Sequence, residues 1–221
     1  MKDNYRKKIK EYFSDKGFVL SFLASTVFLG ASLFVNYFAS YYANEKASSS
    51  VTDLVLSNIP TYNISSLFIY GTLVMFFLII LACFMDPKKI PFTLKGIAVF
   101  YLIRSVFITL THIAPFPTQI AIDPESIVSR ISFGSDLFFS GHTGLPFLLA
   151  LIWWKEPIFR FIFLSFSVFF AVVVLLGHMH YSIDVLGAFF ITYTIFHILE
   201  KLFIKDRIVF YGHKLISGLN D

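Results

Sequence analysis

The chain is poor in charged residues and almost without cysteine. Only 14% of its 221 residues are Asp, Glu, Lys or Arg, whereas 57% are hydrophobic. Soluble domains usually carry about 25% charged residues. The single cysteine, Cys83, can form no internal disulfide and gives no information about the redox compartment. The shortage of charge and a mean hydropathy of +0.74 indicate an integral membrane protein.

Six apolar stretches are long enough to cross a membrane. A transmembrane helix needs about 20 mostly apolar residues to cross about 30 Å of hydrocarbon. The stretches lie at residues 17–42, 63–85, 92–113, 137–154, 160–178 and 181–203. We therefore expect an all-α fold, a polytopic membrane helix bundle of six transmembrane helices that forms a single domain over residues 1–221.

The distribution of basic residues predicts the orientation of the bundle. If the amino terminus is inside, 14 Lys and Arg residues fall on the cytoplasmic side, against Lys46 and Arg130 outside. Cytoplasmic loops carry such an excess of basic residues. We expect both termini in the cytoplasm, with a basic tail at residues 1–16 and a second cytoplasmic tail at residues 204–221. This explanation of the net charge of +4 requires no nucleic-acid partner.

Two short polar clusters, residues 140–143 and 180–184, interrupt the apolar runs. The fourth predicted span enters from outside near Leu137, which places His142 one to two turns below the outer surface. The fifth exits near His178, so His180 lies at its outer tip. Both clusters then share the extracytoplasmic leaflet. Ionisable groups within a membrane are costly and usually mark a functional site.

The two clusters suit chemistry on a phosphate. His180 and Asp184 are four residues apart, so on a helix the carboxylate can orient the imidazole and leave its other nitrogen as nucleophile or base. His142 can supply the complementary proton. Ser140 and Gly141 offer a hydroxyl and an accessible backbone N–H at a helix N-terminus, a favourable setting for an anion. This chemistry requires no metal and no cofactor.

Arg104 and Asp136 are further candidates for substrate binding. The guanidinium of Arg104 suits a phosphate, and a structural ion pair is the alternative. By residue count Arg104 lies about 10 Å below Thr111, so it needs a deep water-filled pocket or a lower membrane boundary. Asp136 lies at the predicted rim, where it could instead cap the fourth helix. His178 alternates with His180, and we expect it at the membrane interface.

Four segments resemble one family. Residues 134–143, followed by residues 177–185, resemble the paired motifs of the sphingomyelin synthase branch of the phosphatidic acid phosphatase type 2 superfamily. Residues 52–60 and 104–111 resemble two further motifs of that branch. The resemblance implies six membrane helices and metal-independent phosphoryl transfer through a phosphohistidine. It implies that His180 is the nucleophile, Asp184 its orienting partner, and His142 the general acid and then the base.

Departures from related branches narrow the implied function. The Lys-x6-Arg-Pro motif of the soluble and lipid phosphatase branches is absent, and no arginine precedes His180 where their third motif has one. The resemblance therefore implies transfer of a phosphoryl or phospho-headgroup from a phospholipid to a lipid alcohol such as ceramide or diacylglycerol. Two alternatives stay open: a phosphatase or phospholipase C-type hydrolase with the same site, and a non-catalytic lipid-binding or transport protein.

Overall fold

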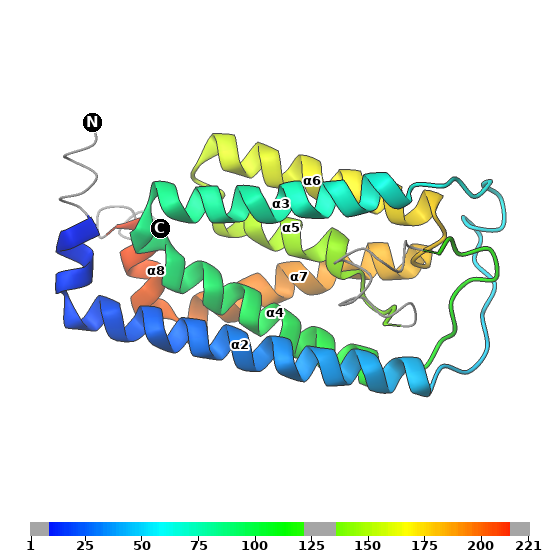
Figure 1. Ribbon diagram of the computed structural model, residues 1–221, viewed down its shortest axis with the longest axis horizontal. Coiled ribbons are helices and arrows are strands. Elements are labelled where there is room, and N and C mark those ends of the chain that lie inside the picture. The colour runs from blue at the N-terminus through cyan, green and yellow to red at the C-terminus, as the bar shows by residue number, and fades with distance from the viewer. Residues whose placement is uncertain (1–8, 122–135, 213–221) are drawn as a thin grey trace.

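The computed structural model describes residues 9–121 and 136–212, and this part of the chain contains helices and no strand, as expected. Figure 1 shows an elongated bundle in which successive long helices run in opposite directions. The elements are α2 (Lys16–Glu45), α3 (Ser65–Met85), the 3-10 turn η1 (Pro87–Lys89), α4 (Ile90–Leu110), α5 (Gly141–Ile152), α6 (Pro157–Leu176), α7 (Ser182–Leu202) and α8 (Ile204–Tyr211).

Five helices in the described part of the chain are long and apolar enough to cross a membrane: α2, α3, α4 together with η1, α6 and α7. They correspond to five of the six predicted spans. The predicted span at residues 137–154 differs, because its helix α5 covers only the 12 residues from Gly141 to Ile152. At 1.5 Å per residue α5 is about 18 Å long. It is therefore shorter than the roughly 30 Å of a hydrocarbon core.

Local sequence signals account for the helix boundaries. The Asp15 carboxylate caps α2 by accepting a hydrogen bond from Gly17 N at 2.9 Å. Pro91 and Pro157 lie in the first turns of α4 and α6, where a missing N–H costs nothing. Ser140 is the N-cap of α5. These prolines thus mark the ends of the short connections from α3 to α4 and from α5 to α6, which join antiparallel neighbours.

The short helix α5 lies at the centre of the bundle. Nine of its twelve residues are buried, and it packs against α6, α7 and α4. Helix α2 lies along α4 on one side, and α3 packs on α6 on the other (Figure 1). We call the end of the bundle where α2 and α4 end and α3 and α7 begin the loop end. Residues 46–64 and 111–121 cover this end, and we call them the outer loops.

Ion pairs join elements at the end opposite the loop end. Lys95 Nζ of α4 lies 2.6 Å from Asp206 Oδ2 of α8, and Lys89 Nζ of η1 lies 2.5 Å from Glu156 Oε1 just before α6. Residues 204–211, expected to belong to a tail, therefore form a helix that packs back on α4.

Gly144 provides a test of this packing. A Cβ atom there would lie 2.8 Å from Thr192 Oγ1 and 2.9 Å from Phe100 Cε2, whereas one at Gly30 of α2 meets nothing within 4 Å. We expect Gly144→Ala to lower the free energy of unfolding by about 1–3 kcal/mol through overpacking. Gly30→Ala should raise it by about 0.5–1 kcal/mol through helix propensity. Unfolding in detergent measures both, and equal effects would contradict the packing of α5.

Candidate active site

Both predicted histidines line one cavity of about 90 Å³ inside the bundle. Its walls come from α2, α3, α4, α5 and the segments that precede α5 and α7. The lining residues are Asn36, Thr72, Met75, Phe76, Tyr101, Arg104, Asp136, Gly141, His142, Leu145 and His180. Five residues predicted for the site therefore meet here. Ser140 and Asp184, also predicted, lie behind the cavity wall.

His180 lies on the cavity side of a buried carboxylate. Its Nδ1 is 3.4 Å from Asp184 Oδ2, and the Asp184 side chain is fully buried. The same oxygen accepts a hydrogen bond from Tyr181 N at 2.9 Å, which fixes the carboxylate in the first turn of α7. With Nδ1 beside Asp184, Nε2 is the ring nitrogen that can act on a substrate.

His142 is the second residue of α5 and is held by aromatic rings. Its imidazole lies 4.3 Å from the ring of Phe68 in α3 and 5.6 Å from that of Phe170 in α6, centroid to centroid. These contacts restrict the orientation of the imidazole and leave it on the cavity wall. The two histidines thus reach one space from different helices.

Ser140 has a structural position that differs from the predicted one. Its hydroxyl accepts a hydrogen bond from Thr143 N at 3.4 Å and caps α5, and its N–H donates to Asp184 O at 3.2 Å. Ser140 is fully buried and does not line the cavity. The cap that we considered for Asp136 is therefore made by Ser140, because the helix begins four residues later than expected.

Arg104 is bound by the segment that leads into α5. Its Nε donates to Phe139 O at 3.0 Å, its Nη2 to Asp136 O at 2.6 Å, and its Nη1 to Asp136 Oδ2 at 3.1 Å. Ser40 of α2 donates to the same carboxylate oxygen at 3.2 Å. The structural pairing of Arg104 is thus present, and Arg104 also lines the cavity.

The start of α5 lies at the depth of Arg104. A Cβ atom on Gly141 would lie 3.1 Å from Arg104 Nε, so the start of α5 is level with Arg104. Arg104 is six residues, or about 9 Å, from the end of α4. His142 therefore lies at about the depth of Arg104, within the one to two turns below the outer end that the sequence predicts. A side chain at Gly141 would press on the guanidinium, which would have to move by a few tenths of an ångström.

His178 is not an interfacial residue, contrary to expectation. It is 3% exposed, and its Nδ1 lies 2.6 Å from Thr118 Oγ1 and 3.1 Å from Thr61 Oγ1. Its backbone has φ 52°, a left-handed conformation that turns the chain after α6. His178 therefore joins both outer loops to the segment that carries His180.

Sequence reasoning missed three polar residues of the cavity: Asn36, Thr72 and Tyr101. Asn36 Oδ1 lies 3.5 Å from Arg104 Nη1, so it contributes to the surroundings of the guanidinium. An asparagine inside an apolar span is itself a signal for a functional or packing role. That signal could have identified Asn36 from the sequence. Thr72 gives no such signal, since a threonine can satisfy its hydroxyl within its own helix, as Thr72 does by donating to Phe68 O.

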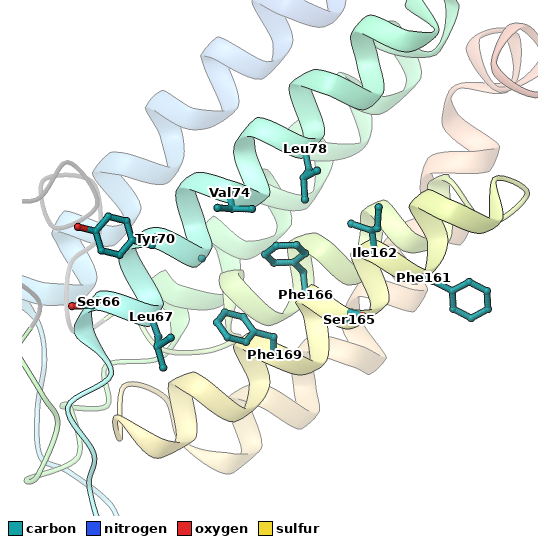
Figure 2. A pocket seen from close by; sticks show the side chains of 11 residues that line it. Ser66, Leu67, Tyr70, Val74, Leu78, Phe161, Ile162, Ser165, Phe166 and Phe169 are labelled. Carbon is teal, nitrogen blue, oxygen red and sulfur yellow. The ribbon is translucent and has the colours of Figure 1, made fainter.

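A larger hollow of about 710 Å³ lies elsewhere, between α3 and α6 (Figure 2). Its walls are formed mainly by apolar side chains such as Leu67, Val74 and Phe166, and they include no histidine and no carboxylate. Phe68 and Phe170, which hold His142, contact each other at 6.3 Å between centroids and do not line this groove. The groove therefore lacks the groups needed for phosphate chemistry.

Across residues 9–121 and 136–212 we find no group of three or more His, Cys, Asp and Glu placed to hold a metal ion. The charged and polar groups of the cavity are instead two imidazoles, one guanidinium and one carboxylate, accompanied by amide and hydroxyl groups. Such a set can bind an anion and transfer protons.

One comparison with known proteins gave a match. Residues 134–202 match the family model for the PAP2 superfamily C-terminal region. The matched stretch contains His142, His180 and Asp184, and it supports the PAP2 superfamily without indicating a branch. PAP2 proteins are typically membrane lipid phosphatases or phosphotransferases. Comparisons with curated proteins and with solved structures found no match.

The Arg104–Asp136 pair predicts a large stability effect. Asp136→Ala would leave a 5% exposed arginine without its carboxylate, and breaking a buried pair costs about 3–5 kcal/mol. Asp86→Ala is the control, because the Asp86 side chain is 33% exposed where it pairs with Lys88 and Lys89 at 3.6 Å, and Lys89 keeps its closer pair with Glu156; partly exposed pairs contribute about 0–1 kcal/mol. Thermal unfolding compares the two variants. Similar losses would show that Asp136 does not stabilise Arg104.

Proposed function

We propose that this chain is a membrane lipid phosphotransferase. It would move a phosphoryl or phospho-headgroup from a phospholipid to a lipid alcohol, such as ceramide or diacylglycerol, through a phosphohistidine. The observation that carries the proposal is that His142 and His180, from separate segments, line the same small cavity. The match of residues 134–202 to the PAP2 superfamily supports the reaction class.

In the first half-reaction, His180 Nε2 attacks the phosphorus atom of the donor lipid. The N–P bond forms while the P–O bond to diacylglycerol breaks, and protonated His142 gives its proton to the leaving oxygen. Asp184 stabilises the positive charge that develops on the His180 ring. Dividing one difficult displacement into two steps is the advantage of covalent catalysis.

In the second half-reaction, His142 acts as the base. It takes the proton of the acceptor hydroxyl, the acceptor oxygen attacks phosphorus, and the N–P bond to His180 breaks. Each proton transfer contributes typically about 10²–10⁴ in rate. Water in place of the lipid alcohol would give hydrolysis by the same residues.

The phosphate itself would be held by the N-terminus of α5 and by Arg104. Gly141 and His142 place the first turn of α5 on the cavity wall, and a helix N-terminus favours an anion. The Arg104 guanidinium adds a permanent positive charge to the same wall. Gly141, Arg104 and Asp136 are thus proposed to bind or orient the substrate, whereas Ser140 acts through the helix it caps.

The size of the cavity supports a lipid substrate. A volume of about 90 Å³ is far below the roughly 300–1,000 Å³ of pockets that enclose a whole small ligand. It can take a phosphate group while the acyl chains stay outside. Phe76 lines the cavity and is also 39% exposed on the outer surface of α3. We infer that the lipid reaches the cavity from the bilayer beside Phe76.

The distribution of basic residues supports an extracytoplasmic site. Lys88, Lys89, Lys155 and Lys201 lie at the end of the bundle opposite the loop end, and such residues are enriched on the cytoplasmic side. Helix α2 also begins and α8 also lies at that end (Figure 1). We therefore propose that both termini are cytoplasmic, that α5 with its leading segment is the sixth span, and that the cavity faces the outer half of the membrane.

Replacing the histidines tests the proposed roles. Purified protein is incubated with phospholipid labelled in the phosphate. We expect His180→Ala to abolish both turnover and labelling of the protein, and His142→Ala to lower kcat by about 10²–10⁴. His197→Ala is the matched control, since this α7 histidine pairs with Glu200 with its side chain 49% exposed, and it should keep full activity. Turnover by His180→Ala would contradict the proposal.

The products distinguish the alternatives. Label that appears in a second lipid when ceramide or diacylglycerol is added supports transfer. Release of free phosphate or headgroup in its place would identify a hydrolase. Binding of phospholipid without turnover by the wild-type protein would identify a lipid-binding or transport protein.

The path beside Phe76 is tested by enlarging its side chain. Phe76→Trp should lower kcat/KM for a long-chain phospholipid several-fold and affect a short-chain soluble analogue much less. Phe77→Trp serves as control, because Phe77 is 62% exposed and does not line the cavity. Equal activities of both variants on the long-chain lipid would exclude this path.

A further inference from the structure

The two outer loops hold the segment around His180 at nearly every residue. This segment, residues 177–182, connects α6 to α7 and contributes His180 to the cavity. The hydrogen bonds from the outer loops run from Ile120 N to Gly177 O (3.0 Å), from Gln119 Nε2 to Met179 O (3.3 Å) and from Val51 N to the Tyr181 hydroxyl (3.2 Å). The segment in turn donates from the Tyr181 hydroxyl to Ala114 O at 2.8 Å.

Asp53 makes the contact with the first residue of α7. Its Oδ2 accepts hydrogen bonds from Ser182 N at 2.7 Å and from Ser182 Oγ at 2.8 Å. Its Oδ1 accepts from Val55 N at 2.8 Å and Leu56 N at 3.0 Å within its own loop. Asp53 is 8% exposed, so this carboxylate is buried with all four partners on one loop and one helix end.

Helix α7 is capped in part by this distant carboxylate, while Asp184 accepts a hydrogen bond from Tyr181 N at the same helix start. The first N–H groups of a helix have no partner within the helix and need an acceptor. Tyr181, which precedes α7, has its hydroxyl bound to Ala114 and Val51. The N–H of Ser182 is therefore satisfied by Asp53, which lies 129 residues earlier in the chain.

We propose that Asp53 is a positioning residue for the nucleophile His180. The inference deepens the proposed function and rests on it. Asp184, which orients the His180 ring, lies in the same first turn of α7 that Asp53 caps. If this turn frays, the carboxylate of Asp184 and the imidazole of His180 move together. Small misplacements of reacting groups can lower a rate about 100-fold.

The charge of Asp53 fits this role. Burial raises the pKa of its carboxyl, but hydrogen bonds from Leu56 N, from Ser182 and from Val55 N lower it, and the net pKa lies below its usual value. Asp53 is thus ionised at neutral pH. A carboxylate at a helix N-terminus is also favoured by the helix dipole.

The experiment measures single-turnover labelling of His180 together with steady-state kinetics. Asp53→Ala should lower the rate of phosphohistidine formation and kcat about 10–100-fold, with KM for phospholipid within about threefold of wild type. Asp53→Asn should restore part of the rate, because its amide oxygen can accept from Ser182. Asn58→Ala is the control: Asn58 is an exposed residue of the same loop that bonds only locally to Leu54 O.

Ser182→Ala provides a second, milder variant that retains the backbone hydrogen bond. It should lower kcat several-fold, and adding it to Asp53→Ala should cause no further loss, because the two residues act through one contact. Additive losses would show that they act separately and would overturn the proposal. So would wild-type labelling by Asp53→Ala, or a loss confined to KM.

Hydrogen exchange separates this inference from the proposed function. In Asp53→Ala the amides of residues 182–184 should exchange faster, while those in the middle of α7 stay protected. If the wild-type protein forms no phosphohistidine, the proposed function is wrong. If the wild-type protein does form phosphohistidine but residues 182–184 keep their protection in Asp53→Ala, only the positioning role is overturned.

Discussion

The hydrogen bonds from Arg104 to the segment before α5 are the constraint on which the site depends. Irregular backbone at membrane depth is tolerated only where its polar groups find partners inside the protein or in a cavity. Arg104 meets the carbonyl oxygens of Asp136 and Phe139, and the Asp136 carboxylate balances its charge. The chain can therefore enter the bundle without a helix and begin α5 midway. A costly buried arginine thus allows His142 to lie deep in the protein.

The two histidines are positioned by different means. His142 depends on the start of a helix, on the Ser140 cap and on the rings of Phe68 and Phe170. His180 depends on contacts that lie outside the bundle core, because loops from two other parts of the chain bind the segment around it. The two outer loops therefore do more than connect helices, because they help to position His180 in the candidate site.

Much of the fold and of the site could be predicted from the sequence, and the errors have a physical origin. Hydropathy located five spans because apolar length alone decides whether a helix can cross a membrane. Hydropathy placed the start of the fourth helix four residues too early, because Leu137 and Phe139 are equally apolar in a helix or in a non-helical segment. The sequence predicted that the two polar clusters lie close together, and His142 and His180 do line the same cavity. The partner of His178 could not be predicted, since it depends on how distant loops fold.

The depth of the cavity bears on the choice between transfer and hydrolysis. Arg104 lies about 9 Å from the end of α4, and the outer loops cover that end with hydrogen bonds to the segment around His180. Water from the loop end would have to pass this cover, whereas on the proposed path a lipid alcohol would arrive through the bilayer beside Phe76. The proposed phosphohistidine would therefore meet a lipid hydroxyl more readily than bulk water. Under the proposed function, the deep start of α5 is thus an argument for transfer over hydrolysis.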